Sequence, residues 1–85
     1  MEKHWKIRNN NKMLEARFEF HNFELVRNFL DNVAEIVDSK QNHPNISFGK
    51  NHASIAIYAE DEALQKEDFI LAEEIDSGFK EVTTI

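Results

Sequence analysis

Alternating apolar and polar residues mark the first part of the chain as a β-hairpin. Trp5 and Ile7 alternate with charged residues, and the alternation resumes after the run Asn9–Asn11. A period of two is typical of a strand with one buried face, because successive side chains point to opposite faces. Asparagine tolerates the left-handed backbone region, so the asparagine run predicts the turn. We therefore expect antiparallel strands over about residues 3–8 and 13–20.

The next segment, about residues 22–40, has the three- and four-residue apolar spacing of an amphipathic helix. Its apolar positions are Leu25, Val26, Phe29, Leu30, Val33, Ala34 and Val37. Asn22 is placed to cap the N-terminus of this helix. Pro44 cannot continue a helix and favours an extended conformation at the residue before it, so the helix must end in the preceding polar stretch.

A second hairpin and a second helix follow. Ile46 and Phe48 begin a strand, and the alternation around Ile55 marks the buried face of the returning strand. Apolar residues at helical spacing then predict a helix over about residues 66–77. Gly78 is placed as the C-terminal stop of this helix.

The predicted order is therefore β-β-α-β-β-α, in one α+β domain that spans residues 1–85. Each hairpin has one apolar face and each helix one apolar stripe. The economical packing is a four-stranded antiparallel sheet with both helices on one face. A domain of this size buries only about 60–65% of its unfolded surface, and the chain has no cysteine to cross-link it. We therefore expect a homodimer or homotetramer, formed through the free sheet face or the open sheet edges.

The net charge of −6 argues against several classes of function. A nucleic-acid-binding face must neutralise phosphates with basic residues, and an anionic membrane surface attracts basic residues in the same way. No apolar run approaches the roughly 20 residues that span a bilayer, and the first residues lack the apolar core of an export signal. We therefore expect neither nucleic acid nor membrane as a partner, and a cytoplasmic location.

Composition and spacing offer few candidates for chemistry. The chain has no cysteine, and no serine lies in a tight glycine turn, so no nucleophile is predicted. His43 and His52 lack the tight spacing of metal ligands, so no metal is predicted either. Taken alone, His43 is a surface histidine or an acid–base group after the first helix. The acidic run Glu60–Glu62 is, by itself, typical of a solvated loop.

The whole chain, taken in order, resembles the pterin-4a-carbinolamine dehydratase family. The resemblance begins at Trp5, continues through "LEARFEF" and "NHPNISFG", and ends with "LQKEDFILAEEID". The family signature is an acidic residue, three spacers and His-His-Pro. An aromatic residue, a further His or Trp after the last strand and an Asp in the final helix follow it. Members have a four-stranded antiparallel sheet with helices on one side. They remove water from a 4a-hydroxytetrahydropterin to give the quinonoid dihydropterin, without a metal or other cofactor.

Four signature positions carry the family's residue type. Asp38 falls on the acidic position, His43 on the second histidine and Pro44 on the proline. Asp68 falls on the Asp of the final helix, and Phe48 lies close to the usual aromatic position. The resemblance implies that His43 exchanges a proton with the substrate. The resemblance also assigns four of these positions to pterin binding. They are Asp38, Pro44 and Asp68, which carry the family's residue, and Phe48, which lies near the aromatic position.

Two of the three catalytic histidines are replaced. Asn42 stands at the first position, where it can hydrogen-bond a pterin but cannot transfer a proton near neutral pH. Glu60 stands at the late position and would need burial to donate a proton near neutral pH. Each acid–base group contributes about 10²–10⁴ in rate, so the resemblance implies a weak dehydratase that uses His43 with Glu60. The alternative is a non-catalytic oligomer that binds a protein, as relatives do in transcription-factor dimerisation and in Rubisco assembly.

Overall fold

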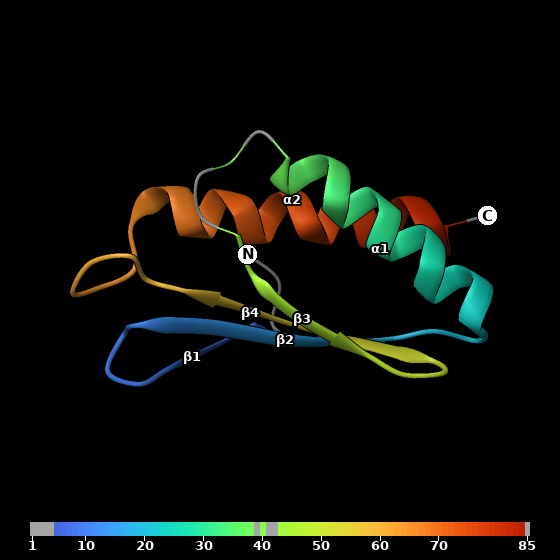
Figure 1. Cartoon of the computed structure of the whole chain (residues 1–85), viewed down its shortest axis with the longest axis horizontal. Helices are drawn as coiled ribbons and strands as arrows, with labels where there is room; N and C mark the ends of the chain where they lie inside the picture. The colour runs from blue at the N-terminus through green and yellow to red at the C-terminus, as the bar shows by residue number, and fades with distance from the viewer. Residues whose placement is uncertain (1–4, 39, 41–42, 85) are drawn as a thin grey trace.

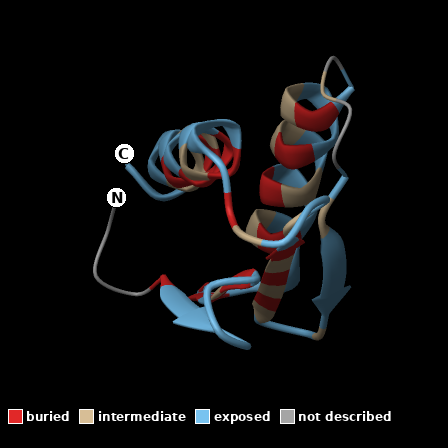
Figure 2. Ribbon diagram, turned by 90° about the vertical axis from the view of Figure 1, so that its left-hand side faces the viewer, coloured by how far each residue is buried: buried red, intermediate tan, exposed pale blue. Residues whose placement is uncertain are grey.

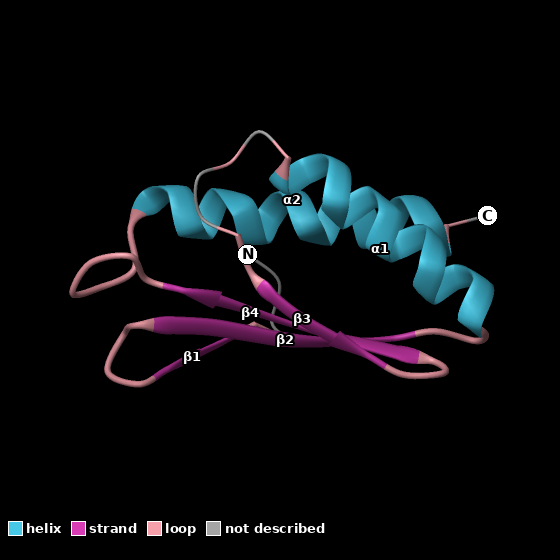
Figure 3. Cartoon of the chain, in the orientation of Figure 1, coloured by secondary structure: helices cyan, strands magenta, loops and turns pink. Residues whose placement is uncertain are grey.

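The computed structural model describes residues 5–38, 40 and 43–84 (Figure 1). Its elements are β1 (Lys6–Arg8), β2 (Met13–Glu19), α1 (Phe23–Val37), β3 (Asn45–Phe48), β4 (His52–Tyr58) and α2 (Lys66–Thr83). The strands form one antiparallel sheet in the order β1-β2-β4-β3, and both helices cover one face of it (Figure 3). The predicted α+β class and the β-β-α-β-β-α order are confirmed.

β2 and β4 form the centre of the sheet and decide which side chains face the helices. Each contributes seven residues to an unbroken antiparallel register that begins with Met13 opposite Tyr58. The next pair, Leu14 and Ile57, faces the helices, and both side chains are fully buried. Because side chains alternate along a strand, this one pairing sets the buried face of the whole sheet.

The turn between β1 and β2 uses three consecutive left-handed residues. Asn9, Asn10 and Asn11 have φ values of 56°, 56° and 68°, a region in which asparagine is enriched over most other residues. The Lys12 N–H donates to the Arg8 carbonyl at 3.1 Å and closes the turn. The predicted turn is therefore confirmed, for the predicted physical reason.

The core lies between the sheet and the helices, where the buried stripes of both helices meet the central strands (Figure 2). Aromatic rings from three elements fill it. The ring centroid of Phe18 on β2 lies 4.9 Å from that of Phe29 on α1 and 5.0 Å from that of Phe79 on α2. Phe20 lies 5.3 Å from each of the same two helix residues. The packing of both helices onto β2 is therefore largely aromatic.

A buried hydrogen bond joins the beginning of the described chain to α2. The Trp5 indole Nε1–H donates to Asp76 Oδ1 at 2.8 Å, and both residues are 5% exposed. The indole also packs edge-on against Phe18, with a centroid distance of 6.0 Å. Since the two partners are 71 residues apart in sequence, this contact holds the first hairpin against the last helix.

The start of α1 is as predicted, but its first residue is not in the core. Asn22 Oδ1 accepts a hydrogen bond from the Leu25 N–H at 3.0 Å, which confirms the expected N-cap. The helix ends at Val37, somewhat before the expected boundary. Phe23, the first residue of the helix, is 43% exposed although it is a large apolar residue. It lies at the edge of the sheet, where its ring contacts that of Phe48 at a centroid distance of 6.3 Å.

Gly78 does not end α2, contrary to the expectation from sequence. The helix continues through it to Thr83, and Gly78 does not have a positive φ. It lies where α2 crosses α1: a Cβ added there would be 3.4 Å from Asn32 Cβ and from Ile36 Cδ1. Asn32 Nδ2 also donates to the Gly78 carbonyl at 3.1 Å. The glycine therefore serves a close helix crossing rather than a helix end.

None of the helices in the described ranges is long and apolar enough to cross a membrane.

The Trp5–Asp76 bond is expected to carry measurable stability. Asp76→Ala should lower the free energy of unfolding by about 2 kcal/mol, because hydrogen bonds to charged groups contribute about 1.5–3 kcal/mol. Asp76→Asn keeps an acceptor oxygen and should lose about half as much. Urea unfolding measures both values, and a cycle with Trp5→Phe isolates the pair. If Asp76→Ala lowers the free energy of unfolding by the same amount in the Trp5→Phe background, the loss of stability does not come from this hydrogen bond.

The close helix crossing makes a second prediction, at Gly78. Gly78→Ala should be neutral or raise stability by up to about 1 kcal/mol, since helix propensity improves and the new methyl group meets only ordinary contacts. Gly78→Leu should lower stability by about 1–3 kcal/mol through overpacking against α1. Thermal unfolding checks both variants. A large loss with alanine would mean that the helices cross more closely than described.

Candidate functional site

The β3–β4 hairpin brings His43 and Glu60 to the same end of the sheet. Asn45, at the start of β3, pairs with Ala56, near the end of β4. His43 precedes β3 by two residues and Glu60 follows β4 by two residues. Because the strands are antiparallel, the start of β3 and the end of β4 lie at one end, away from the β3–β4 turn (Figure 1). His43 and Glu60 adjoin these two strand ends.

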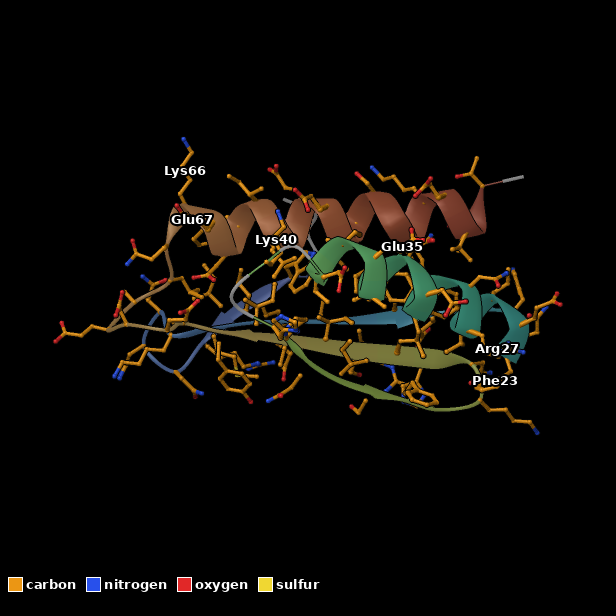
Figure 4. The ribbon with its side chains drawn as sticks, turned by 45° about the horizontal axis from the view of Figure 1, so that its top comes forward. Phe23, Arg27, Glu35, Lys40, Lys66 and Glu67 are labelled. Atoms are coloured by element: carbon orange, nitrogen blue, oxygen red, sulfur yellow. The ribbon has the colours of Figure 1, made fainter. Side chains whose placement is uncertain are left out.

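His43 is exposed, and a backbone carbonyl orients its ring. Its Nε2 lies 3.1 Å from the Lys40 carbonyl oxygen. Since a carbonyl only accepts, this contact assigns the ring proton to Nε2 and leaves Nδ1 as the nitrogen that can exchange a proton. Lys40 is itself held: its N–H donates to Val37 O at 3.0 Å, and its Nζ is 3.2 Å from Glu74 Oε1 on α2. Figure 4 shows Lys40 beyond the end of α1, beside α2.

Glu60 begins an irregular loop, residues 60–63, between β4 and α2. The two ends of this loop are bound to the β1–β2 turn: the Ala59 N–H donates to Lys12 O at 2.8 Å, and the Leu64 N–H donates to Asn11 O at 2.9 Å. Glu60 itself is exposed. The burial that would suit it to proton donation near neutral pH is therefore not supplied by the described residues of one chain.

Asp38 and Pro44 lie close in sequence to His43, on either side of it. Asp38 is exposed and is the C-cap residue of α1, where its backbone N–H donates to the Ala34 carbonyl. Pro44 is partly buried and leads directly into β3. Asn42, the predicted hydrogen-bonding neighbour of His43, lies outside the described residues.

Asp68 and Phe48, two further candidates, have structural partners. Asp68 is buried, and its Oδ2 accepts from the Gln65 N–H at 2.8 Å in the capping box of α2. Phe48 is at the other end of β3 from His43, against Phe23 at the start of α1. The structure therefore does not bring Phe48 together with His43. The assignment of both residues to pterin binding stays a prediction.

A groove of about 240 Å³ runs across the outer face of the sheet toward the end that carries His43. Its lining comes from β2, β3 and β4: Met13, Glu15, Asn45, Ile46, Ser47, Ser54, Ile55, Ala56 and Tyr58. Ligand sites that bury a drug-sized molecule usually have about 300–1,000 Å³. This groove alone is therefore too small to enclose such a ligand.

Within residues 5–38, 40 and 43–84, no group of three or more histidine or acidic side chains is placed to hold a metal ion.

Sequence reasoning missed the residues that hold this end of the molecule together. Lys40, Glu74 and the carbonyl of Asn11 each contact a segment far away in the chain or a neighbouring loop. Neither periodicity nor a motif marks them, because surface lysines and glutamates are common and backbone acceptors carry no residue type. Only the three-asparagine run gave a signal, and it indicated a turn without indicating what the turn would bind.

The fold and the loop that carries His43 and Pro44 agree with the small α+β domain expected from the sequence. Residues 1–78 match the family model described as "Pterin 4 alpha carbinolamine dehydratase", and the chain belongs to this family. A protein from Halorhodospira halophila that bears the name of such a dehydratase is 32% identical over 74 residues, which is 86% of this chain and 68% of that protein. One from Azoarcus sp. is 26% identical over 73 residues, or 85% and 62% of the two lengths. The chain thus spans about two thirds of the length of these relatives.

Two solved structures share the fold, each with a TM-score of 0.80. One is described as a pterin dehydratase-like protein identified as a RuBisCO assembly factor in the alpha-carboxysome. It is 29% identical, and the match covers 88% of both chains. The other is described as a transcriptional coactivator/pterin dehydratase from Brucella melitensis. It is 16% identical, over 89% of this chain and 82% of that one, so this second likeness shows the fold alone.

Proposed function

We propose that this protein is a weakly active pterin-4a-carbinolamine dehydratase in which His43 is the main acid–base group. The observation that carries the proposal is the β3–β4 register, which brings the His43-Pro44 loop and Glu60 to one end of the sheet. Family membership supports the same chemistry, since the match includes both loops. The substrate is a 4a-hydroxytetrahydropterin, and the site uses no metal.

The reaction needs two proton transfers. The hydroxyl group leaves C4a as water when it receives a proton, and a ring N–H gives one up. With Nε2 bonded to the Lys40 carbonyl, Nδ1 of neutral His43 accepts the ring proton. Water donates the proton to the leaving hydroxyl, because exposed Glu60 lacks the burial that proton donation near neutral pH requires. The imidazolium then returns its proton to solvent. Replacement of two histidines that each contribute about 10²–10⁴ accounts for the low rate that we propose.

A dehydratase assay on the purified chain tests this proposal. His43→Ala is expected to abolish turnover, because it removes the one imidazole that the described residues bring to this end of the sheet. The double reversion Asn42→His with Glu60→His is expected to raise turnover by about 10² or more, since it restores two acid–base groups. His21→Ala changes an exposed histidine just before α1 and should leave turnover unchanged.

Two results would contradict weak catalysis. Equal turnover in the wild-type chain and in His43→Ala would exclude His43 as the acid–base group. Absence of turnover in the wild-type chain, with activity in the double reversion, would mean that this end of the sheet still binds a pterin but that catalysis has been lost.

A second candidate function is a non-catalytic oligomer that binds another protein, and the exposed apolar edge of β3 favours it. Ile46 and Phe48 are 40% and 55% exposed, although they pair with buried residues of β4 and face the helix side. Phe23 extends the same apolar surface from the start of α1. The solved structure that is 29% identical is named as an assembly factor, and its match covers 88% of each chain.

The two edges of the sheet differ in a way that also favours association through β3. β3 (Asn45–Phe48) carries neither a charge nor a proline. β1, the other edge, has only three residues, two of which are Lys6 and Arg8. Charged, short edge strands resist the addition of another strand, whereas an uncharged apolar edge accepts one. We therefore propose a homodimer or larger homo-oligomer that uses the β3 edge.

Light scattering during size-exclusion chromatography measures the oligomer. Phe48→Glu is expected to shift the protein to a monomer, because it puts a charge into the apolar edge. Ile7→Glu is the matched control, since Ile7 is an exposed apolar residue of the opposite edge strand. A monomeric wild-type chain would rule out this oligomer, and dissociation by Ile7→Glu alone would move the contact to β1.

A further inference from the structure

The loop that carries Glu60 is held at both ends by two consecutive carbonyls. Lys12 O accepts from the Ala59 N–H at 2.8 Å, and Asn11 O accepts from the Leu64 N–H at 2.9 Å. Residues 60–63 therefore leave the end of β4 and return to the β1–β2 turn before α2 begins, between neighbouring anchors. Leu64 is also buried in the core, so the far end of the loop is fixed by its side chain as well as by its backbone.

The left-handed conformation of residues 9–11 sets the direction of the two anchoring carbonyls. Asn9, Asn10 and Asn11 all have φ near +60°, and the turn closes with the Lys12 N–H on the Arg8 carbonyl. The left-handed region is strained for most L-residues, whereas asparagine adopts it more often than most other side chains. Three left-handed residues in succession would strain most sequences, and the run of three asparagines permits this conformation.

We infer that the asparagine turn, residues 9–11, is a positioning element for the candidate active site. Through the carbonyls of Asn11 and Lys12 it fixes the loop that presents residue 60 at the same end of the sheet as His43. No side chain of the turn has to touch the substrate. The catalytic part of this inference rests on the proposed dehydratase function. The attachment of residues 60–63 to the turn by these two carbonyls, called the clamp below, can be tested without it.

Asn10 is the best position at which to test the turn. It is the central residue of the run, it is exposed, and its φ is 56°. Asn10→Gly and Asn10→Val both delete the amide side chain, but only glycine adopts this φ without strain. The pair therefore separates the backbone conformation from any effect of the asparagine side chain.

Amide hydrogen exchange of the full chain is the first readout. In Asn10→Val the Leu64 amide is expected to exchange about tenfold faster than in the wild-type chain, because the strained turn releases its anchors more often. In Asn10→Gly it should remain within about twofold of wild type. The Ile55 amide, in the middle of β4, exchanges by global unfolding and therefore measures how much overall stability each variant loses. Equal exchange at Leu64 in all three proteins would overturn the clamp.

Turnover in the Asn42→His, Glu60→His background is the second readout. Asn10→Val is expected to lower kcat there by about tenfold, with recovery in Asn10→Gly. Faster Leu64 exchange with unchanged kcat would overturn the positioning role and leave only a structural clamp. If no variant shows turnover, the dehydratase proposal and the catalytic part of this inference fail together. The clamp is then decided by the exchange data alone.

Discussion

The seven-residue register between β2 and β4 is the constraint on which the other features of this protein depend. A shift of β2 by one residue against β4 would turn Leu14 and Phe18 to the outer face while Ile57 still faced the helices, and the core would be lost. The same register fixes which loops share an end of the sheet. The β1–β2 turn, the start of β3 and the loop after β4 meet at one end, so core and candidate site follow from a single strand pairing.

Polar contacts then attach the helices, and they differ in what they contribute. The Trp5–Asp76 bond is buried, so it stabilises the fold and fixes the position of α2 over the first hairpin. The Lys40–Glu74 ion pair is partly exposed, and pairs of this kind contribute about 0–1 kcal/mol. The pair matters for position more than for stability. It holds Lys40 beside α2, and the Lys40 carbonyl in turn orients the imidazole of His43.

The two proposed functions use separate parts of the surface. His43 and Glu60 lie where β3 begins and β4 ends, whereas Phe23 and Phe48 lie at the opposite end of β3. Association through the β3 edge would therefore leave the loop after β4 in place. An assembly surface could therefore stay unchanged whatever residues occupy the loops of His43 and Glu60, which is consistent with relatives of which some are named as dehydratases and one as an assembly factor.

Local sequence patterns determined the order of elements, the buried faces of β2, β4 and the helices, the Asn22 cap and the asparagine turn. Each of these depends on neighbouring residues, through alternation, helical spacing or backbone preference. Patterns also marked His43 and Glu60 as candidates, through the family resemblance. Their roles in the chemistry stay predictions.

Only the tertiary structure decided the features that depend on partners far along the chain. It assigned Gly78 to a helix crossing, left Phe23 exposed at the sheet edge, and bonded Asp76 to an indole 71 residues away. It also joined the asparagine turn to the loop that carries Glu60. A glycine has the same backbone preference at a helix end and at a helix crossing, and an aromatic residue is equally apolar in the core and at a sheet edge. A backbone carbonyl likewise carries no mark of its partner. The local sequence therefore determines the element, and only packing determines what the element contacts.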